Sequence, residues 1–529
     1  MPTANVSELL RVLVPVLLAG YFIFNILRFA KREKHLPPGP PTWPVVGNAH
    51  LLAAGQVHIK LKELAEQYGS VFSLKIGKST MIVLNDPQAI FDLIHKKGSL
   101  FVDRPQDQHW DLAYHDEVLS IMHDGDSYKA MRKIVQQLLT PRNLDTKFHK
   151  IQEAEINRLM LDLLERPEDF GASIKRTSAS IASIILYGFR ATSSDSFWAT
   201  AVFDTMTRFN ETLSPGQYLP VTQFPFLGYI PEYFLASIEF AKQTYRDTTA
   251  VFAHARELVD ARRRNGDMRE SLADRLSDGS IQPDISLTNE EVNSGVLGAS
   301  YQGGAETTTG HTLTNLLFLA KNPHFQDKAR EQLDHVCGKT RMPQWSDFEN
   351  LPYINCIVKE GLRIRPVTPI GAPHCAKEDV WYKDMLIPKG ATIIIPAYAL
   401  NFTYHEDPET YNPDRYLDYS KLSAALAASP DYGNRDHYTF GSGRRNCVGI
   451  HLAERTLWRM IAQILWAFNI EQAVDEHGKL IELDESAYMD GLLLAPKPFQ
   501  IRLVPRSREH AEVVRSAVAE SEEYLQRWE

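Results

Sequence analysis

The sequence predicts a mainly α-helical protein with small β-sheets. Apolar residues in residues 72–83 alternate on either side of Gly77-Lys78, which predicts a hairpin. Helical periodicity dominates most of the chain that follows. A second β-rich stretch is expected at residues 385–396, where three consecutive isoleucines precede a proline.

Composition points to one large folded domain. Hydrophobic residues make up 44% and charged residues 23% of the 529 residues, which supports a sizeable core. No repeat, flexible linker or long charge block divides residues 37–505. The net charge of -9 argues against nucleic-acid binding, which normally requires a basic surface. Four cysteines without paired spacing predict a reducing compartment and no disulfide framework.

The N-terminal region predicts a membrane anchor. Residues 9–29 are nearly all apolar and approach the ~20 residues that span a bilayer, despite Pro15 and Asn25. A basic cluster follows them, whereas a cleavable signal peptide would place its positive charges first. The positive-inside tendency then keeps the rest of the chain in the cytosol.

These features divide the chain into five parts. They are a short N-terminal segment (1–8), a transmembrane anchor helix (9–29), a basic and proline-rich hinge (30–41), the main domain (42–505) and a charged C-terminal tail (506–529). The hinge contains Pro37-Pro38-Gly39-Pro40-Pro41, which cannot continue a helix and should hold the anchor and the domain at a set spacing.

A glycine-rich loop around Cys447 carries the strongest signal of function. It reads Phe440-Gly441-Ser442-Gly443-Arg444-Arg445-Asn446-Cys447-Val448-Gly449 and leads into a long apolar helix pattern. Free N–H groups and the dipole at a helix start favour a thiolate that can ligate a metal. The glycines would let a large flat cofactor approach the backbone. A structural cysteine is the alternative for a lone Cys at this place.

A second unusual segment lies inside a predicted helix at residues 288–320. Thr288 and Glu291 form a capping box, and the helix contains Gly303-Gly304-Ala305-Glu306-Thr307-Thr308. Two glycines inside a helix cost ~1 kcal/mol each relative to alanine, so another object should pack closely against them. A helix–helix crossing is the alternative explanation.

The loop resembles the haem-thiolate loop of the cytochrome P450 family, and the helix segment resembles its oxygen-binding groove. The resemblance implies a P450-like haem-thiolate fold with haem b, in which Cys447 is the axial ligand of the haem iron. Arg445 would pair with a haem propionate, Phe440 would pack near the sulfur, and Gly441 would leave room for the cofactor. Thr307 would hydrogen-bond dioxygen, and Glu306 would relay protons from solvent.

The resemblance implies three further cofactor contacts. Tyr128 and Arg132 fall where the family commonly has Trp-x-x-x-Arg, and they share one helical face towards a propionate. Tyrosine for tryptophan is a departure, although its hydroxyl can still donate. His374 matches a position where the family often has Arg or His as a propionate contact. A histidine without that role is the alternative.

A structural network is also implied. Glu360 and Arg363 share a face of a predicted helix at residues 352–365. Pro413-Asp414-Arg415-Tyr416 resembles the family's Pro-x-Arg-Phe segment, with tyrosine in place of phenylalanine. In the family, Glu360, Arg363 and Arg415 would form a buried network that locks the haem loop, and such charges persist only when partnered.

The resemblance implies a membrane-anchored monooxygenase. It would insert one oxygen atom into a lipophilic small organic substrate, with a role in biosynthesis such as fungal secondary metabolism. No dinucleotide-binding motif or flavin domain is evident, so NADPH-cytochrome P450 reductase would supply electrons, with cytochrome b5 as a second candidate donor. The anchor would hold the catalytic domain (42–505) on the cytosolic side of the endoplasmic reticulum membrane.

Substrate contacts are expected in five ranges: 103–122, 203–240, 296–306, 367–370 and 487–493. Apolar side chains in these ranges suggest an apolar cavity, and they are Phe209, Phe224, Phe226, Val367 and Leu492.

Two other functions stay open. A haem-thiolate isomerase or dehydratase would need no reductase, although an intact Glu306-Thr307 pair argues against it. A non-catalytic haem or metal-binding membrane protein is the other alternative. Cys447 and His451 have the spacing of half a zinc site, but no second ligand pair follows.

Overall fold

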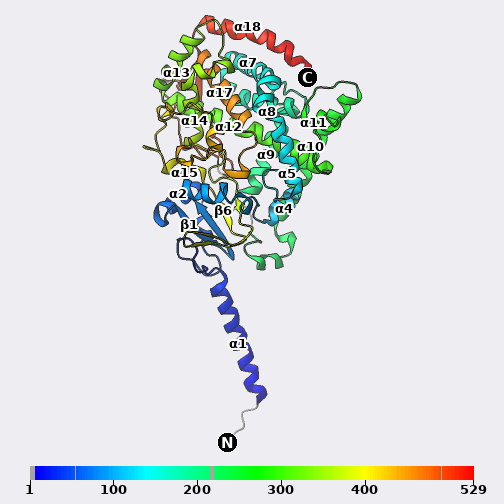
Figure 1. The fold of residues 1–529 in the computed structure, drawn as a ribbon, viewed down its shortest axis with the longest axis vertical. Coiled ribbons are helices and arrows are strands. Elements are labelled where there is room, and N and C mark those ends of the chain that lie inside the picture. The colour runs from blue at the N-terminus through cyan, green and yellow to red at the C-terminus, as the bar shows by residue number, and fades with distance from the viewer. Residues whose placement is uncertain (1–5, 54, 215–219, 490) are drawn as a thin grey trace.

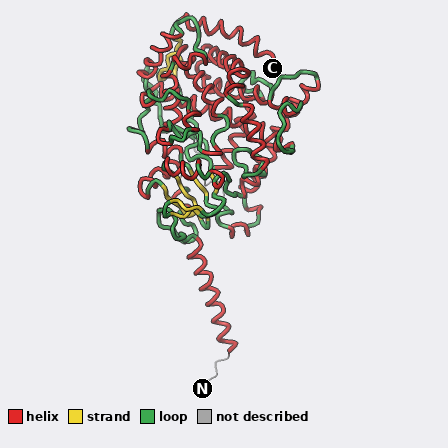
Figure 2. The backbone as a smooth tube through the Cα atoms, viewed as in Figure 1, coloured by secondary structure: helices red, strands yellow, loops and turns green. Residues whose placement is uncertain are grey.

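Helices form most of the structure, and three small sheets complete it (Figure 1). The computed structural model describes residues 6–53, 55–214, 220–489 and 491–529. Figure 2 shows the strands gathered mainly at the end of the body from which the N-terminal helix projects. This arrangement confirms the predicted mainly α fold with small sheets.

The largest sheet has four strands in the order β1-β2-β6-β3. β1 (Val71–Ile76) and β2 (Ser79–Leu84) form the predicted hairpin around Gly77, which has a positive φ of 55°. β6 (Thr392–Ile394) pairs with β2 in parallel and with β3 (His374–Cys375) antiparallel. The sheet therefore joins segments about 300 residues apart and fixes the position of His374.

Two pairs of antiparallel strands form the other sheets. They are β4 (Val380–Tyr382) with β5 (Met385–Ile387), and β7 (Phe468–Gln472) with β8 (Ile501–Pro505).

α12 (Ala299–Lys321) is the central helix of the body (Figure 1). It packs against α8 (Phe170–Tyr187), α14 (Pro352–Ile364) and α17 (Ile450–Ala467). The residues from Thr308 to Ala320 are buried throughout, because neighbours cover the helix on every side. A Cβ at Gly361 would clash with the Asn315 side chain, so this glycine lets α14 lie close to α12.

The predicted helix at residues 288–320 forms with a change of pitch. Its first part (Glu291–Gly298) is a π-helix that continues directly into α12. The predicted capping box is present, since the Thr288 amide donates to Glu291 Oε2 at 2.7 Å and the Glu291 amide donates to Thr288 Oγ1 at 3.1 Å.

The other α-helices surround this centre. They are α2 (Val57–Tyr68), α3 (Pro87–Ile90), α4 (Gln108–Tyr114), α5 (Asp126–Leu138), α6 (Pro141–Asn143), α7 (His149–Glu165), α9 (Phe197–Leu213), α10 (Ala236–Arg264), α11 (Leu272–Ser277), α13 (Pro323–Val336), α15 (Ala397–Thr403), α16 (Ser423–Ala428) and α18 (Arg508–Leu525).

α1 (Val6–Phe29) projects from the body near the large sheet (Figure 1). Many of its apolar side chains are exposed, among them Leu17 and Tyr21. Within the part of the chain that the structure describes, no helix has the length and apolarity that crossing a membrane requires. This finding gives no support to the anchor predicted at residues 9–29. The anchor stays a prediction. Residues 1–5 of the predicted N-terminal segment lie outside the described residues.

The predicted C-terminal tail is a helix that docks on the body. α18 packs against α7, and Trp528 behind it is buried. Arg190 holds this end in place, because its Nη1 lies 2.9 Å from a carboxylate oxygen of Glu522 and 2.9 Å from one of Glu529. Its Nε lies 3.0 Å from Glu155 Oε1, and the Glu155 side chain is fully buried.

Replacing Arg190 should loosen the C-terminal helix. Arg190→Met removes a positive charge from three carboxylates, those of Glu155, Glu522 and Glu529, and the Glu155 carboxylate is buried. The free energy of unfolding should therefore fall by roughly 3 kcal/mol. Arg508→Met removes only an exposed pair with Glu512 and should leave stability unchanged. Thermal and denaturant unfolding of both variants would measure the difference, and equal losses would contradict this role of Arg190.

Candidate active site

The Cys447 loop is closed by backbone contacts immediately before α17. The Cys447 amide donates to the Phe440 carbonyl oxygen at 2.9 Å. Gly441 and Gly443 have φ values of 70° and 65°, a conformation that favours glycine. A Cβ at Gly443 would also lie 2.5 Å from the carbonyl oxygen of Ile94. Two of the glycines in the motif are therefore required by the backbone of the loop.

Cys447 is accessible although protein atoms surround its thiol densely. The residue is exposed, although Arg445 and Ile450 on either side of it are buried. Burial by the surrounding protein raises the pKa of the thiol, and the Gly449 amide and Arg132 act in the opposite direction. Since a coordinating cation deprotonates a thiol outright, this position suits a metal-bound thiolate.

The two glycines of α12 have different surroundings. Gly303 is exposed in mid-helix, and a Cβ there would meet nothing within 4 Å, so it borders open space. A Cβ at Gly304 would lie 3.4 Å from Ala182 on α8, which is the close helix contact considered as the alternative. The Thr307 hydroxyl donates to the Gly303 carbonyl oxygen at 2.7 Å. The Gly303 side of α12 therefore has both room and a polar group.

Glu306 lies three residues after Gly303 on α12 and is only partly exposed. Burial raises the pKa of its carboxyl group, and Lys175 acts in the opposite direction. A raised pKa increases the protonated fraction near neutral pH, and a protonated carboxyl group can donate a proton. The environment of Glu306 is compatible with the predicted proton relay.

Arg445 is buried with part of its hydrogen-bonding capacity unused. Its Nε donates to the Val102 carbonyl oxygen and its Nη2 to the Met122 carbonyl oxygen, both at 2.7 Å. Nη1 is buried and has no partner among the described residues. The guanidinium carbon lies 3.5 Å from the centre of the Tyr128 ring, so Tyr128 supports Arg445 from one side.

Tyr128 and Arg132 lie on the same face of α5, as their spacing predicts. Arg132 Nη2 donates to the backbone oxygen of Asn446 at 2.7 Å and to its side-chain oxygen at 2.8 Å. The Tyr128 hydroxyl is 3.5 Å from the Arg444 carbonyl oxygen, a long contact. Arg132 therefore holds the residue next to Cys447.

Arg104 belongs to the same cluster, and sequence reasoning missed it. Its Nη2 donates to the Ser120 carbonyl oxygen at 2.7 Å, and its Nη1 donates to that of Pro373 at 2.5 Å. Burial, followed by the charge of Arg445, lowers its pKa to about 9. No motif marks Arg104 in the sequence, because its partners are backbone oxygens of two distant loops.

His374 lies in β3 and is buried. Its Nδ1 is 2.9 Å from the Phe101 carbonyl oxygen, to which it must donate. Burial, followed by the charge of Arg104, lowers the pKa of His374 to about 3, so the ring is neutral. In this tautomer Nε2 has no proton to give to a propionate. The predicted contact with the cofactor requires another protonation state and stays a prediction.

The arginine cluster fits an anionic cofactor. The described residues give Arg104, Arg132 and Arg445 backbone and amide oxygens, and no salt bridge to a carboxylate. Burial and the neighbouring arginine charges lower the pKa values of Arg104 and Arg445, so an anion near these side chains would be stabilised. Haem carries two carboxylates and a metal that binds thiolate, so these residues and Cys447 fit this group.

Glu360, Arg363 and Arg415 come together as the family resemblance implies. Glu360 Oε2 lies 2.7 Å from Arg363 Nε and 3.1 Å from Arg415 Nε. The Glu360 and Arg363 side chains are fully buried. The Asn412 amide also donates to Glu360 Oε1 at 2.7 Å. The network joins α14 to the turn at Pro413–Tyr416.

The expected substrate contacts separate into two groups. Phe209, Val367 and Leu492 lie in one buried apolar cluster. Phe224 and Phe226 instead pack against Phe29 at the end of α1, with ring centres 6.1 and 6.0 Å from it. These two rings connect the body with the N-terminal helix, a contact that no local pattern reveals.

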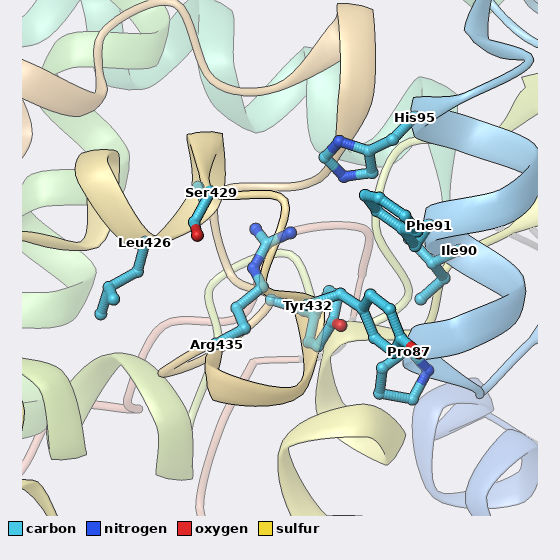
Figure 3. A pocket seen from close by; sticks show the side chains of 10 residues that line it. Pro87, Ile90, Phe91, His95, Leu426, Ser429, Tyr432 and Arg435 are labelled. Atoms are coloured by element: carbon cyan, nitrogen blue, oxygen red, sulfur yellow. The ribbon is translucent and has the colours of Figure 1, made fainter.

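A different, small pocket lies beside the Cys447 loop (Figure 3). Its volume of about 10 Å³ has room for no more than one water molecule, so it is not a cofactor site. Arg435 lines it, and its guanidinium donates to the Gly441 carbonyl oxygen at 2.5 Å and to Ser442 Oγ at 2.8 Å. Arg435 therefore supports the loop from the pocket side.

Comparison with known proteins agrees with this site. The family model of cytochrome P450 matches residues 37–503. The chain belongs to the cytochrome P450 family. It is 34% identical over 520 residues to a cytochrome P450 monooxygenase of Arthrobotrys oligospora, with 96% of each chain covered. It is 34% identical over 492 residues to cytochrome P450 monooxygenase yanC of Aspergillus niger, with 91% of each chain covered.

A third relative is cytochrome P450 monooxygenase macC of Penicillium terrestre, which is 33% identical over 511 residues, with 95% of each chain covered. The protein is a cytochrome P450 monooxygenase, and membership of this family implies a haem cofactor and suggests a reductase partner.

Replacing Arg104 should weaken haem retention. Hydrogen bonds to charged groups contribute about 1.5–3 kcal/mol, so the affinity of Arg104→Met for haem should fall by roughly tenfold or more. Arg341→Met, which removes a pair with Asp347 in another part of the chain, should retain haem like the wild type. Haem-to-protein ratios after purification and haem transfer to apomyoglobin would measure this. Equal retention in both variants would contradict a cofactor role for Arg104.

Proposed function

We propose that this P450 is a haem-thiolate monooxygenase that inserts one atom of dioxygen into a lipophilic small organic substrate in a fungal biosynthetic pathway. The second oxygen atom leaves as water. The proposal rests chiefly on Cys447, an exposed residue of the glycine-rich loop whose neighbour Arg445 has a buried Nη1 with no partner among the described residues. Cys447 would hold haem b, with Arg104, Arg132 and Arg445 near its carboxylates. When bound, the haem supplies the activation of dioxygen.

Thr307 and Glu306 on α12 would then deliver protons to the bound dioxygen. Gly303 leaves room at the groove, and the Thr307 hydroxyl, now bonded to the Gly303 carbonyl oxygen, could rotate to donate into it. Glu306 would bring a proton from the Lys175 side of the helix. Glu306 and Thr307 would thereby supply the protons that the release of one oxygen atom as water requires.

The substrate class follows from the apolar cluster around Phe209, Val367 and Leu492. Burial of an apolar molecule against these side chains is favourable by about 25 cal/mol per Å². Tyr114 contributes a buried hydroxyl to the same cluster. A largely apolar substrate with few polar groups would suit these side chains.

Electrons would come from NADPH through a separate cytochrome P450 reductase, with cytochrome b5 as a second candidate donor. Arg444 is exposed in the Cys447 loop itself, and Lys97 and Lys129 are exposed on neighbouring segments. Gly98 and Arg444 lie in contact range, so two basic segments meet there. A basic surface favours an acidic protein partner and speeds its association.

Replacing Cys447 tests the proposed function. The reduced wild-type protein under carbon monoxide should show an absorption band at about 450 nm, which Cys447→Ser should lose because the thiolate donor is gone. Cys356→Ser, at a buried cysteine on α14, should keep the band. Absence of any haem signal in folded wild-type protein would overturn the proposal. Product formation without reductase would instead favour the isomerase or dehydratase alternative.

We also propose that the protein lies on the cytosolic face of the endoplasmic reticulum membrane, anchored by residues 9–29. Exposed apolar side chains along α1 support this. So do exposed aromatic residues of the segment that Phe29 contacts, namely Phe226, Tyr229, Tyr233 and Phe234. Aromatic rings are favoured at membrane interfaces.

Charges introduced into α1 test the anchor. Each arginine at the centre of a spanning helix costs about 2.5–3.5 kcal/mol, so Leu17→Arg combined with Leu18→Arg should release the protein from membranes. Leu417→Arg changes an equally exposed leucine on the body and should have no effect. Flotation of the full chain with phospholipid vesicles would measure this, and equal flotation of both variants would contradict the anchor.

A further inference from the structure

Two adjacent residues of α14 carry opposite, fully buried charges. Glu360 binds Arg363 and Arg415, as described above. Lys359 points to another segment and forms an ion pair with Asp436, and each of these side chains is 1% exposed. Asp436 lies eleven residues before Cys447 in the chain. α14 therefore binds two separate segments through neighbouring charges.

Several hydrogen bonds complete the surroundings of Asp436. Ser423, at the start of α16, donates its hydroxyl to the Asp436 carboxylate and lies 3.1 Å from His437 Nε2. The His437 amide donates to Asp436 Oδ1 at 2.9 Å, and the Tyr416 hydroxyl donates to the Asp436 carbonyl oxygen at 2.9 Å. A buried carboxylate with this many donors is held in one position.

Two further hydrogen bonds hold the backbone between Asp436 and Cys447. Thr439 Oγ1 donates to the Leu362 carbonyl oxygen of α14 at 2.7 Å, so α14 holds the segment at a second point. The next residue is Phe440, whose carbonyl oxygen accepts the Cys447 amide at 2.9 Å. The position of Cys447 thus depends on a segment that Lys359 and Leu362 attach to α14.

We propose that Lys359 and Asp436 are positioning residues for Cys447, acting as a second buried ion pair separate from the Glu360–Arg363–Arg415 network. The pair directs the loop so that the sulfur faces the open space. Separating two buried charges is strongly unfavourable, so segment 436–440 has no alternative place of similar free energy. This inference rests on the proposed function, in which Cys447 ligates haem.

Four full-length variants test the pair. Lys359→Met and Asp436→Asn each leave one group without its partner, and Lys359→Met combined with Asp436→Leu removes both charges. Glu155→Gln is the matched control, since it weakens the buried pairs of Glu155 with Arg176 and Arg190. For each, the 450 nm band of the reduced protein under carbon monoxide and its rate of conversion to a band at about 420 nm are recorded. Thermal unfolding is measured on the same samples.

If Lys359 and Asp436 position Cys447, the conversion rate and the thermal stability should respond differently. Lys359→Met and Asp436→Asn should convert about tenfold faster than the wild type, because the loop is less well held. Glu155→Gln should lower thermal stability and leave the conversion rate unchanged. The double variant should recover thermal stability, since no unpaired charge remains, and should still convert faster than the wild type.

The double variant keeps the inference falsifiable even if a single variant does not fold. A conversion rate equal to that of the wild type in the double variant would show that the pair only avoids an unpaired charge, and would overturn the positioning role. Unchanged rates in folded single variants would overturn it too. Absence of the 450 nm band in the wild type would overturn the proposed function, and the inference with it.

Discussion

Buried charge on α14 is the constraint on which the site depends. A charge removed from water must be paired. Glu360 pairs with Arg415 and Lys359 pairs with Asp436, and these two ion pairs decide where the segments that contain Arg415 and Asp436 can lie. One of these segments ends in the loop that carries Cys447. α14 can do this because Gly361 lets it lie close to α12.

The space beside Cys447 is bordered by groups that are incompletely satisfied without a ligand. Arg445 has a buried nitrogen with no described partner, and burial together with neighbouring arginine charges lowers the pKa values of Arg104 and Arg445. Such groups are costly in a protein without ligands and favourable around an anionic cofactor. Arg104, Arg132 and Arg445 would therefore contribute to the binding of haem.

Local patterns predicted much of the fold and the chemical type of the site. The hairpin, the capped helix that contains Gly303 and the helix of Glu360 follow from periodicity, turn residues and capping. The sequence could not predict why each of the two positions is a glycine. A Cβ at Gly303 would meet nothing within 4 Å, whereas a Cβ at Gly304 would contact Ala182 on a helix distant in the sequence. Arg104 was missed for a similar reason, and Phe224 and Phe226 were assigned to a cavity although they contact Phe29.

The sequence by itself determined the family and the residue types of the site, because the spacing around Cys447 and within α12 is a property of continuous segments. Only the tertiary structure decided which cations surround the open space, how His374 is protonated, and that Lys359 pairs with Asp436. Those properties depend on burial and on groups distant in the chain, and neither burial nor long-range pairing is encoded in any local pattern.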